Sequence, residues 1–216
     1  MKRTFVVLLI LFSLSTGSSF AIDAAGSAFG TLTGASAVGQ GKGSFGFGVG
    51  VADATSFVGS FTFGLSEYTD GRIKLGLVDQ DGADTKFTIG ADFKWQYWSY
   101  GPNTNHPFDM AVGGFFEYAD YDFLSVVQIG GHLIGSYPIH LKNGGTLAPY
   151  ARINARLEAL SLDRPAGFTG DDSESNLELG FNGGVQWIMT STVTFYGEFQ
   201  LDGNDGVFMG VDFNVM

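Results

Sequence analysis

Residues Lys86–Tyr97 read KFTIGADFKWQY, and the polarity of their side chains changes with every residue. The odd-numbered positions are aromatic, aliphatic or alanine, whereas the even-numbered positions are charged residues, glutamine, threonine or glycine. Because successive side chains of a β-strand point to opposite faces, this period of two predicts a strand with one apolar and one polar face.

The same alternation recurs along the rest of the chain, with turn residues between the segments. The segments are Gly43–Val51, Ser56–Leu65, Arg72–Val78, Lys86–Tyr97, Phe108–Tyr118, Leu124–Tyr137, Leu147–Leu160, Leu177–Trp187, Val193–Leu201 and Val207–Met216. Repeated alternating segments of this length are typical of a transmembrane β-barrel. We therefore predict an all-β fold, a closed antiparallel transmembrane barrel of ten strands. Eight strands are the alternative, because the fifth and sixth segments are glycine-rich and less regular.

The composition of the two faces separates a membrane barrel from a secreted soluble β fold. The polar faces consist mainly of Gly, Ser, Thr, Asn and Gln with spaced charges of both signs, and the apolar faces carry many of the 21 phenylalanines. Glycine weakens a soluble strand but leaves room inside a narrow barrel. The pattern favours an apolar face toward lipid and a polar face toward an enclosed interior.

The first 21 residues have the features of a signal peptide. Lys2 and Arg3 precede an apolar run, Phe5–Leu14, and Ser19–Ala21 forms a small-x-small cleavage site. The run is about ten residues long, whereas a membrane-spanning helix needs roughly 20. We expect a signal peptide at 1–21, a segment at 22–42 that is a periplasmic lead-in or is tucked into the barrel mouth, and the barrel at 43–216. An uncleaved membrane anchor is the alternative for the leader.

Charge and cysteine content exclude some classes of function. Loss of Lys2 and Arg3 from 11 basic residues, against 22 acidic ones, leaves a net charge of −13. Such acidity argues against nucleic acid as a partner. The chain has no cysteine, so stability must come from strand pairing and burial.

Alternation also predicts which charged side chains line the interior. These are Arg72, Lys74, Lys86, Asp92, Lys94, Asp109, Glu117, His132, Arg152, Arg156, Glu158, Glu178, Glu198 and Asp212. Buried charges are costly unless they are paired, so one interpretation is a salt-bridged interior closed by its own side chains. The other is a constriction that selects small polar solutes. Ten strands leave little lumen in either case.

The direction of each strand predicts on which side of the membrane the aromatic residues and the loops lie. With both termini in the periplasm, the longest connection, 161–175, falls outside the cell. The predicted interfacial aromatics then gather at the periplasmic end of the barrel; they are Trp95, Tyr97, Trp98, Tyr137 and Trp187.

No catalytic, cofactor-binding or metal-binding residue is expected. The histidines do not fall near the external rim, where a hydrolase of this architecture would place its base. Asp79–Asp84 has spacing like a calcium loop, but it also forms a good hairpin turn through Asp81-Gly82. We therefore predict that the protein is not an enzyme.

The closing residues Gly210–Val215 resemble the terminal signal by which bacterial outer-membrane barrels are recognised for insertion. The matching positions are Gly210, Phe213 and Val215, with one residue, Met216, after them. The chain resembles a small porin-like outer-membrane β-barrel protein. The resemblance implies delivery through the periplasm, insertion by the barrel assembly machinery and contact with outer-membrane lipid. We expect a structural or narrow porin-like role, passing small polar solutes. The alternatives are a surface receptor or adhesin acting through loop 161–175, and an outer-membrane hydrolase.

Overall fold

A computed structural model describes residues 26–79, 84–101, 104–121, 124–142, 144–162 and 173–215. The strands are β1 (Gly43–Val51), β2 (Thr55–Ser66), β3 (Thr69–Asp79), β4 (Lys86–Trp98), β5 (Asp109–Tyr121), β6 (Leu124–Ser136), β7 (Ile139–His140), β8 (Thr146–Leu162), β9 (Ser173–Ile188), β10 (Val193–Leu201) and β11 (Gly206–Val215). Among the residues described, no helix is long and apolar enough to span a membrane.

Ten of these strands form a closed antiparallel ring, and β7 adds a two-residue pairing to β8. Each strand pairs with its neighbour in sequence, β6 pairs with β8, and β1 pairs with β11 to close the barrel. The first and last strands stay in register over their whole length, from Gly43 opposite Val215 to Val51 opposite Val207. The predicted all-β closed barrel and its ten strands are confirmed, and the eight-stranded alternative is wrong.

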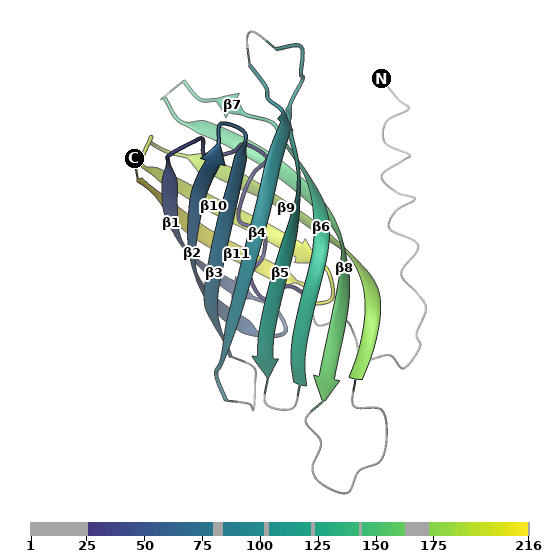
Figure 1. The fold of residues 1–216 in the computed structure, drawn as a ribbon. Helices are drawn as coiled ribbons and strands as arrows, with labels where there is room; N and C mark the ends of the chain where they lie inside the picture. The colour runs from purple at the N-terminus through teal and green to yellow at the C-terminus, as the bar shows by residue number, and fades with distance from the viewer. Residues whose placement is uncertain are drawn as a thin grey trace, which may run out of the picture.

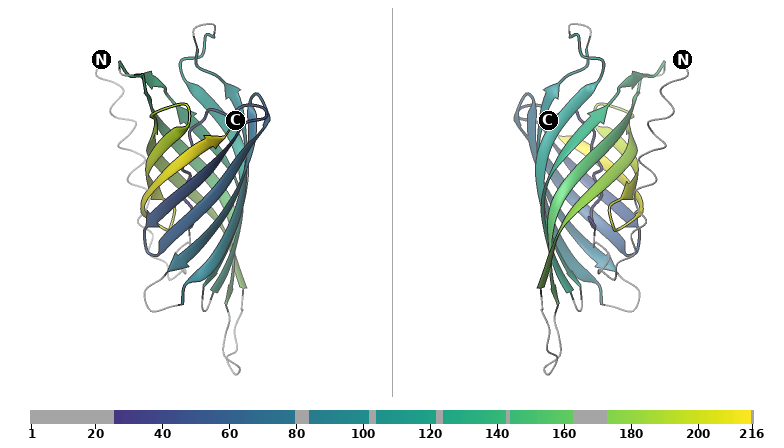
Figure 2. Two further views of the ribbon diagram at one scale, coloured as in Figure 1. Left: turned by 90° about the vertical axis from the view of Figure 1, so that its left-hand side faces the viewer. Right: turned by 90° about the vertical axis from the view of Figure 1, so that its right-hand side faces the viewer.

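The strands are inclined to the barrel axis, and the two ends of the barrel differ (Figures 1 and 2). We call the end that holds the start of β1 and the end of β11 the terminal rim; the turns after β2, β4, β6 and β9 lie there. We call the other end the far rim; it holds the connections after β1, β3, β5, β8 and β10. Strands β8 and β9 have 17 and 16 residues, against nine in β1 and β10, so one side of the wall is longer than the other.

The outer surface of the barrel is apolar over nearly every strand. Phe47 is 60% exposed and Leu179 is 75% exposed, values that a soluble domain keeps for polar side chains. The same face carries Phe45, Phe57, Phe61, Ile73, Leu75, Leu77, Phe87, Ile89, Phe93, Val112, Phe116, Val127, Ile129, Ile153, Leu157, Leu177, Phe181, Val185, Phe195, Phe199, Val207 and Met209. A continuous exposed apolar surface of this extent marks contact with a membrane or with another protein.

The inner surface is polar and closely packed. Residues on this face include Arg156, Glu158, Asn182 and Gln200, each at most 1% exposed. Because the pleat sends alternate residues to opposite sides, these side chains share strands with the apolar residues of the outer face. The barrel therefore has its polar core inside and its apolar residues outside, the reverse of a soluble β-barrel.

Candidate functional site

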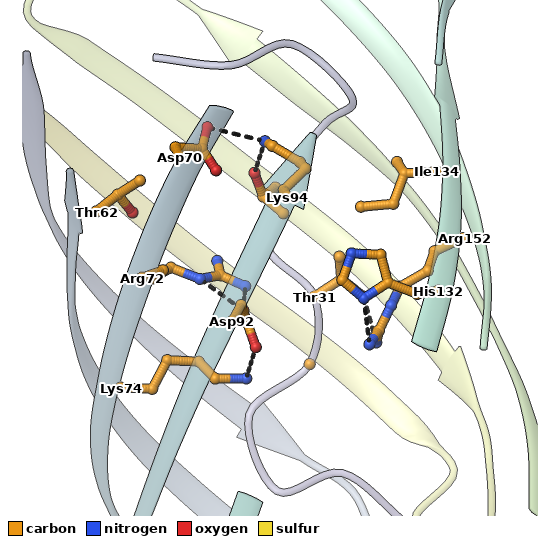
Figure 3. A pocket seen from close by; sticks show the side chains of 12 residues that line it. Thr31, Thr62, Asp70, Arg72, Lys74, Asp92, Lys94, His132, Ile134 and Arg152 are labelled. Carbon is orange, nitrogen blue, oxygen red and sulfur yellow. Dashed lines mark hydrogen bonds and ion pairs between the residues drawn. The ribbon is translucent and has the colours of Figure 1, made fainter. Parts of the chain in front are cut away.

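The barrel interior is occupied by the stretch of chain that precedes β1. We call residues 26–38 the internal segment; it runs through the interior from the far rim to the terminal rim (Figures 1 and 3). At the far rim, the carbonyl oxygen of Ser27 accepts a hydrogen bond of 3.0 Å from Asn204 Nδ2. At the terminal rim, the backbone N–H of Val38 donates to Asp70 Oδ2 at 3.2 Å. A turn at residues 39–42, closed by Lys42 N to Gly39 O at 3.2 Å, then leads into β1.

Acceptors on the barrel wall bind the backbone N–H groups of the internal segment. The carboxylate of Glu198 accepts two of them, from Thr31 at 2.6 Å and from Leu32 at 3.0 Å. The other pairs are Ser27 N to Asp202 Oδ2, Ala35 N to Ser136 Oγ, Ala37 N to Gln96 Oε1 and Val38 N to Asp70 Oδ2. Hydrogen bonds to charged groups are about twice as strong as neutral ones, so the carboxylates fix this backbone firmly.

Donors on the wall bind the oxygen atoms of the same segment. The ammonium of Lys94 donates three hydrogen bonds, to Thr33 Oγ1 at 3.1 Å and to the carbonyls of Gly34 and Ser36 at 2.9 Å. Further pairs are Gln128 Nε2 to Gly26 O, Gln200 Nε2 to Ser27 O, Arg72 Nη1 to Leu32 O and Arg152 Nη1 to Thr31 Oγ1. Polar groups taken out of water need such partners, and here the wall supplies them.

Two apolar side chains of the internal segment fit against glycines of the wall. Phe29, which is 1% exposed, packs where β3 and β4 carry Gly76 and Gly90; a Cβ at either glycine would lie about 3 Å from the Phe29 ring. The ammonium of Lys74 lies 4.7 Å from the centre of that ring. Leu32 lies in the same way against Gly48, where a Cβ would come within 2.8 Å of its Cδ1 atom, and near Gly210. The inward glycines thus leave the space that these side chains occupy.

A charge network on β3 and β4 surrounds Asp92 (Figure 3). Asp92 forms an ion pair with Arg72, and its Oδ1 atom lies 3.1 Å from Lys74 Nζ. Lys74 also pairs with Glu117 on β5 at 2.7 Å. One further pair, Lys94 with Asp70 at 3.5 Å, lies closer to the terminal rim. Each buried cation here has a carboxylate beside it, which offsets the cost of desolvation.

A second network lies at the far rim around Arg156. Its guanidinium lies 3.3 Å from Glu158 Oε2 and 3.6 Å from Asp202 Oδ2, and it donates to the Asp202 carbonyl oxygen. Asp202 is in the turn after β10 and also accepts from Ser27 of the internal segment. Burial raises the pKa of the Asp202 carboxyl to about 6, against the opposing effect of Arg156.

Arg152 of β8 contacts His132 of β6. Arg152 Nη2 lies 3.4 Å from His132 Nδ1, and the guanidinium lies 4.8 Å from the centre of the Phe115 ring. Its Nη1 atom reaches Thr31 at 3.1 Å and Asn182 at 3.5 Å. These contacts link the wall to the internal segment without a carboxylate in direct contact.

The structure places the fourteen charged residues singled out from the sequence as follows. Buried on the inner face are Arg72, Lys74, Lys94, Asp109, Glu117, His132, Arg152, Arg156, Glu158 and Glu198. Partly exposed are Lys86, Asp92, Glu178 and Asp212. Asp212 accepts hydrogen bonds from Tyr196 and Ser44 across the closure of the barrel. Asp109 binds both the internal segment, through Ser36 Oγ, and the turn after β4, through Tyr100 N.

The sequence predicted a segment at 22–42 that is either a periplasmic lead-in or tucked into the barrel mouth, but not its path through the whole interior or several of the groups that bind it. The missed wall residues are Asp70, Gln96, Gln128, Ser136, Asn182, Gln200, Asp202 and Asn204. Asp70 and Asp202 lie outside the alternating segments, and the amides and Ser136 carry no charge, so a pattern of charges within strands does not single them out. The absence of any charge between residues 26 and 41 is a signal that fits a peptide enclosed by a charged wall.

The five aromatic residues singled out from the sequence and the end of β11 lie near the terminal rim. Trp95, Tyr137 and Trp187 expose between 39 and 50% of their surface, and Tyr97 and Trp98 are half-buried. The Trp98 ring stacks on His106 with 5.4 Å between ring centres. On β11, Phe213 and Val215 face outward, and Gly210 faces Leu32 of the internal segment.

Little free volume remains in the interior. One cavity of about 20 Å³ lies between the internal segment and the wall, and a second cavity of about the same volume lies beside Phe29 and Leu32. The charged or ionisable residues that line the first cavity are all labelled in Figure 3; they are Asp70, Arg72, Lys74, Asp92, Lys94, His132 and Arg152. A single water needs about 10–15 Å³ by this measure, so the cavity holds one or two waters. Among the described residues, the cavities beside the internal segment therefore have room for single waters.

Two regions considered at the sequence level lie largely outside the described residues. Loop 161–175 is described only at its ends, and residues 80–83 of the candidate calcium loop are not among those described. Within the described part of the chain, no three His, Asp or Glu side chains are grouped as metal ligands would be.

Comparison with solved structures finds other barrels at low sequence identity. The N-terminal β-barrel domain of Pseudomonas aeruginosa OprF is 13% identical, with a TM-score of 0.40, over 82% of this chain and 99% of that one. The KdgM porin is 10% identical, with a TM-score of 0.39, over 79% of this chain and 98% of that one. No protein-family model and no curated protein matches the chain. This chain is similar to those barrels, and its description as a closed ten-stranded barrel comes from its own strand pairing.

Proposed function

We propose that this protein is an integral outer-membrane β-barrel with a porin-like wall. In the state described its role is structural, and its interior passes at most water and very small polar solutes. After export and loss of residues 1–21, the barrel assembly machinery inserts the chain with the terminal rim toward the periplasm.

The observation that carries the proposal is the division of the closed wall into two faces. The ring of ten strands leaves no free β edge between β1 and β11. Its outer face is apolar on nearly every strand, and its inner face is charged and hydrogen-bonded. A bilayer offers no hydrogen bonds to the backbone, so a closed ring with its apolar face outward satisfies the requirement for a membrane-spanning sheet.

Folding in the presence and absence of a membrane mimic tests the proposal. The mature chain, residues 22–216, should fold in detergent micelles or lipid vesicles and migrate differently on a gel before and after boiling. In cell fractions it should be found with the outer membrane. A monomeric, folded chain in plain buffer would contradict the proposal, because an exposed apolar belt of this size is not stable in water.

Planar bilayers test the narrow interior. Full-length mature protein should give no conductance steps or only very small ones, because the cavity of about 20 Å³ accommodates one or two waters. Large steady steps from the full-length protein would show that the interior is open and that the structural role is wrong.

A further inference from the structure

We propose that the barrel interior is a peptide-binding site, filled in cis by residues 26–38, and that the same site binds this peptide when it is supplied in trans. The inference rests on the proposed membrane barrel and adds to it a ligand class: an extended, uncharged peptide with small side chains. Occupancy of the site closes the lumen.

The contacts recognise peptide backbone more than side chains. Glu198, Asp202 and Asp70 accept from backbone N–H groups, and Lys94, Gln128 and Gln200 donate to backbone carbonyls. They come from β3, β4, β6, β10 and the turn after β10, so the segment is held from opposite sides of the ring. A site that binds backbone groups in this way selects an extended chain.

The interior has room for a large side chain at two positions along the segment. Phe29 occupies the space left by Gly76 and Gly90, and Leu32 occupies the space left by Gly48. Between and beyond these two residues the segment is made of Gly, Ala, Ser, Thr and Val. The interior thus has one aromatic and one aliphatic subsite, whereas a Cβ added at Gly26, Gly30 or Gly34 of the segment would come within 2.9 Å of a wall or turn atom.

The barrel wall does not depend on the internal segment for its own pairing. The closing pair β1–β11 and the pair β6–β8 have continuous register, and residues 26–38 form none of the strand pairs. Within the described ranges, the backbone–backbone hydrogen bonds between the wall and the chain just before β1 are those of Gly41 and Lys42 with Gly64, at the terminal rim. Loss of the segment would leave a complete ring with its polar groups open to water.

A turn at residues 39–42 connects the segment to β1. Gln40, Gly41 and Lys42 are exposed at the terminal rim, where the segment meets β1. A cut at this turn would convert the occupant into a separate peptide held by hydrogen bonds and by the two apolar subsites alone.

The main experiment compares the mature chain with a variant that lacks residues 22–38, both inserted in planar bilayers. The truncated barrel should give conductance steps at least five-fold larger than any from the full-length protein. A synthetic peptide of residues 26–38, GSAFGTLTGASAV, should then block these steps in a dose-dependent way. The control peptide carries Phe29→Ala and Leu32→Ala and should block at least ten-fold more weakly.

Peptide binding is measured independently of conductance. A fluorescently labelled 26–38 peptide should show saturable binding to truncated barrels in detergent micelles, with competition by the unlabelled peptide and not by the control peptide. Equal binding of both peptides, or no binding to barrels that show heat-modifiable migration, would overturn the inference.

A second variant covers the case in which the truncated chain does not fold. A specific protease site replaces Gln40–Lys42, the protein is folded with its segment in place, and the site is then cut. Conductance should appear as the peptide is lost from the micelles, measured by mass spectrometry. Cut barrels that have lost the peptide and conduct no more than uncut ones would overturn the inference. Failure of every variant to enter membranes would instead overturn the proposed function.

Discussion

The carboxylate of Glu198 binds the backbone of Thr31, accepting its N–H at 2.6 Å, and its second oxygen accepts the N–H of Leu32 at 3.0 Å. Glu198 also accepts from the hydroxyl of Tyr150 at 2.6 Å and from Asn182 Nδ2 at 2.9 Å. One wall residue therefore joins the internal segment to β8, β9 and β10.

Replacement of this carboxylate should weaken the whole barrel. Glu198→Ala removes the acceptor of the Thr31 and Leu32 N–H groups and of the Tyr150 hydroxyl, and one of the two acceptors of Asn182 Nδ2. An unsatisfied buried group costs about 1–3 kcal/mol. We expect Glu198→Ala to lower the free energy of unfolding by about 3 kcal/mol or more. Urea titration in lipid vesicles, followed by tryptophan fluorescence, measures the change.

Glu178→Ala is the matched control for this prediction. Glu178 lies half-buried on β9 with its side chain partly in solvent, so its loss should cost less than about 1 kcal/mol. Equal losses at the two positions would show that Glu198 has no special role in holding the segment.

The contact between Gly48 and Leu32 can be tested by a double-mutant cycle. A Cβ at Gly48 would lie 2.8 Å from Leu32 Cδ1 and 3.2 Å from Met209 O. Overpacking of this kind costs about 1–3 kcal/mol, so Gly48→Ala should be destabilising by that amount. Leu32→Ala in the same chain should recover at least half of the loss, because the closest clash is then removed.

Gly197→Ala serves as the control for that cycle. No atom lies within 4 Å of a Cβ built at Gly197, on the outer face of β10. It should change the unfolding free energy little, with or without Leu32→Ala. A Gly48→Ala penalty that Leu32→Ala does not reduce would place Leu32 away from Gly48.

A charged side chain introduced near the middle of β4 tests whether the outer face of this strand contacts lipid. Phe93 is 49% exposed on the outer face, and a charged residue that faces the bilayer midplane costs about 2–4 kcal/mol. Phe93→Arg should therefore destabilise the vesicle-inserted barrel by that amount, whereas Phe93→Leu should cost far less. Similar unfolding curves for the two variants would mean that β4 does not face lipid here.

Stability should fall with rising pH around the titration of Asp202. Its folded pKa is about 6, raised by burial from 3.8, so between about pH 4 and 6 the folded state holds a proton that the unfolded chain has lost. Unfolding free energy should decrease as pH rises through this window, by an amount on the order of 2–3 kcal/mol at about 1.4 kcal/mol per pKa unit.

Asp202→Asn separates this contribution from those of other groups. Arg156 and Glu117 face Asp202, and Ser27 and Asn204 donate backbone hydrogen bonds to it. In the variant, the free energy of unfolding should depend less on pH between pH 4 and 6. Compared with the unsubstituted protein, the variant should gain stability at pH 7 relative to pH 4. Parallel pH profiles for the two proteins would assign the titration to another group.

Much of the wall could be predicted from local pattern. The period of two in Lys86–Tyr97 predicted β4 to within one residue, since the structure ends it at Trp98. The glycine-rich segments near Phe108 and Leu124 also form strands, β5 and β6. Their inward glycines lie close to neighbouring backbone and to His132, where the crowded interior has no room for a side chain. Alternation works here because side-chain direction in a strand depends on position alone.

The contents of the lumen could not be derived in the same way. Asp70 lies at the start of β3 and Asp202 in the turn after β10, at opposite rims, yet both bind the internal segment. Arg152 contacts Thr31, 121 residues earlier in the chain. Such contacts depend on ring closure and on which stretch of chain enters the ring, and neither leaves a periodic trace in the residues concerned.

By itself, the sequence determined strand positions and the division of each strand into two faces, since both follow from the geometry of a single extended chain. Only the tertiary structure decided that residues 26–38 fill the interior and that wall carboxylates bind their backbone. The physical reason is that a buried backbone group must find a partner, and which partner is within reach is settled only when the ring closes around the segment.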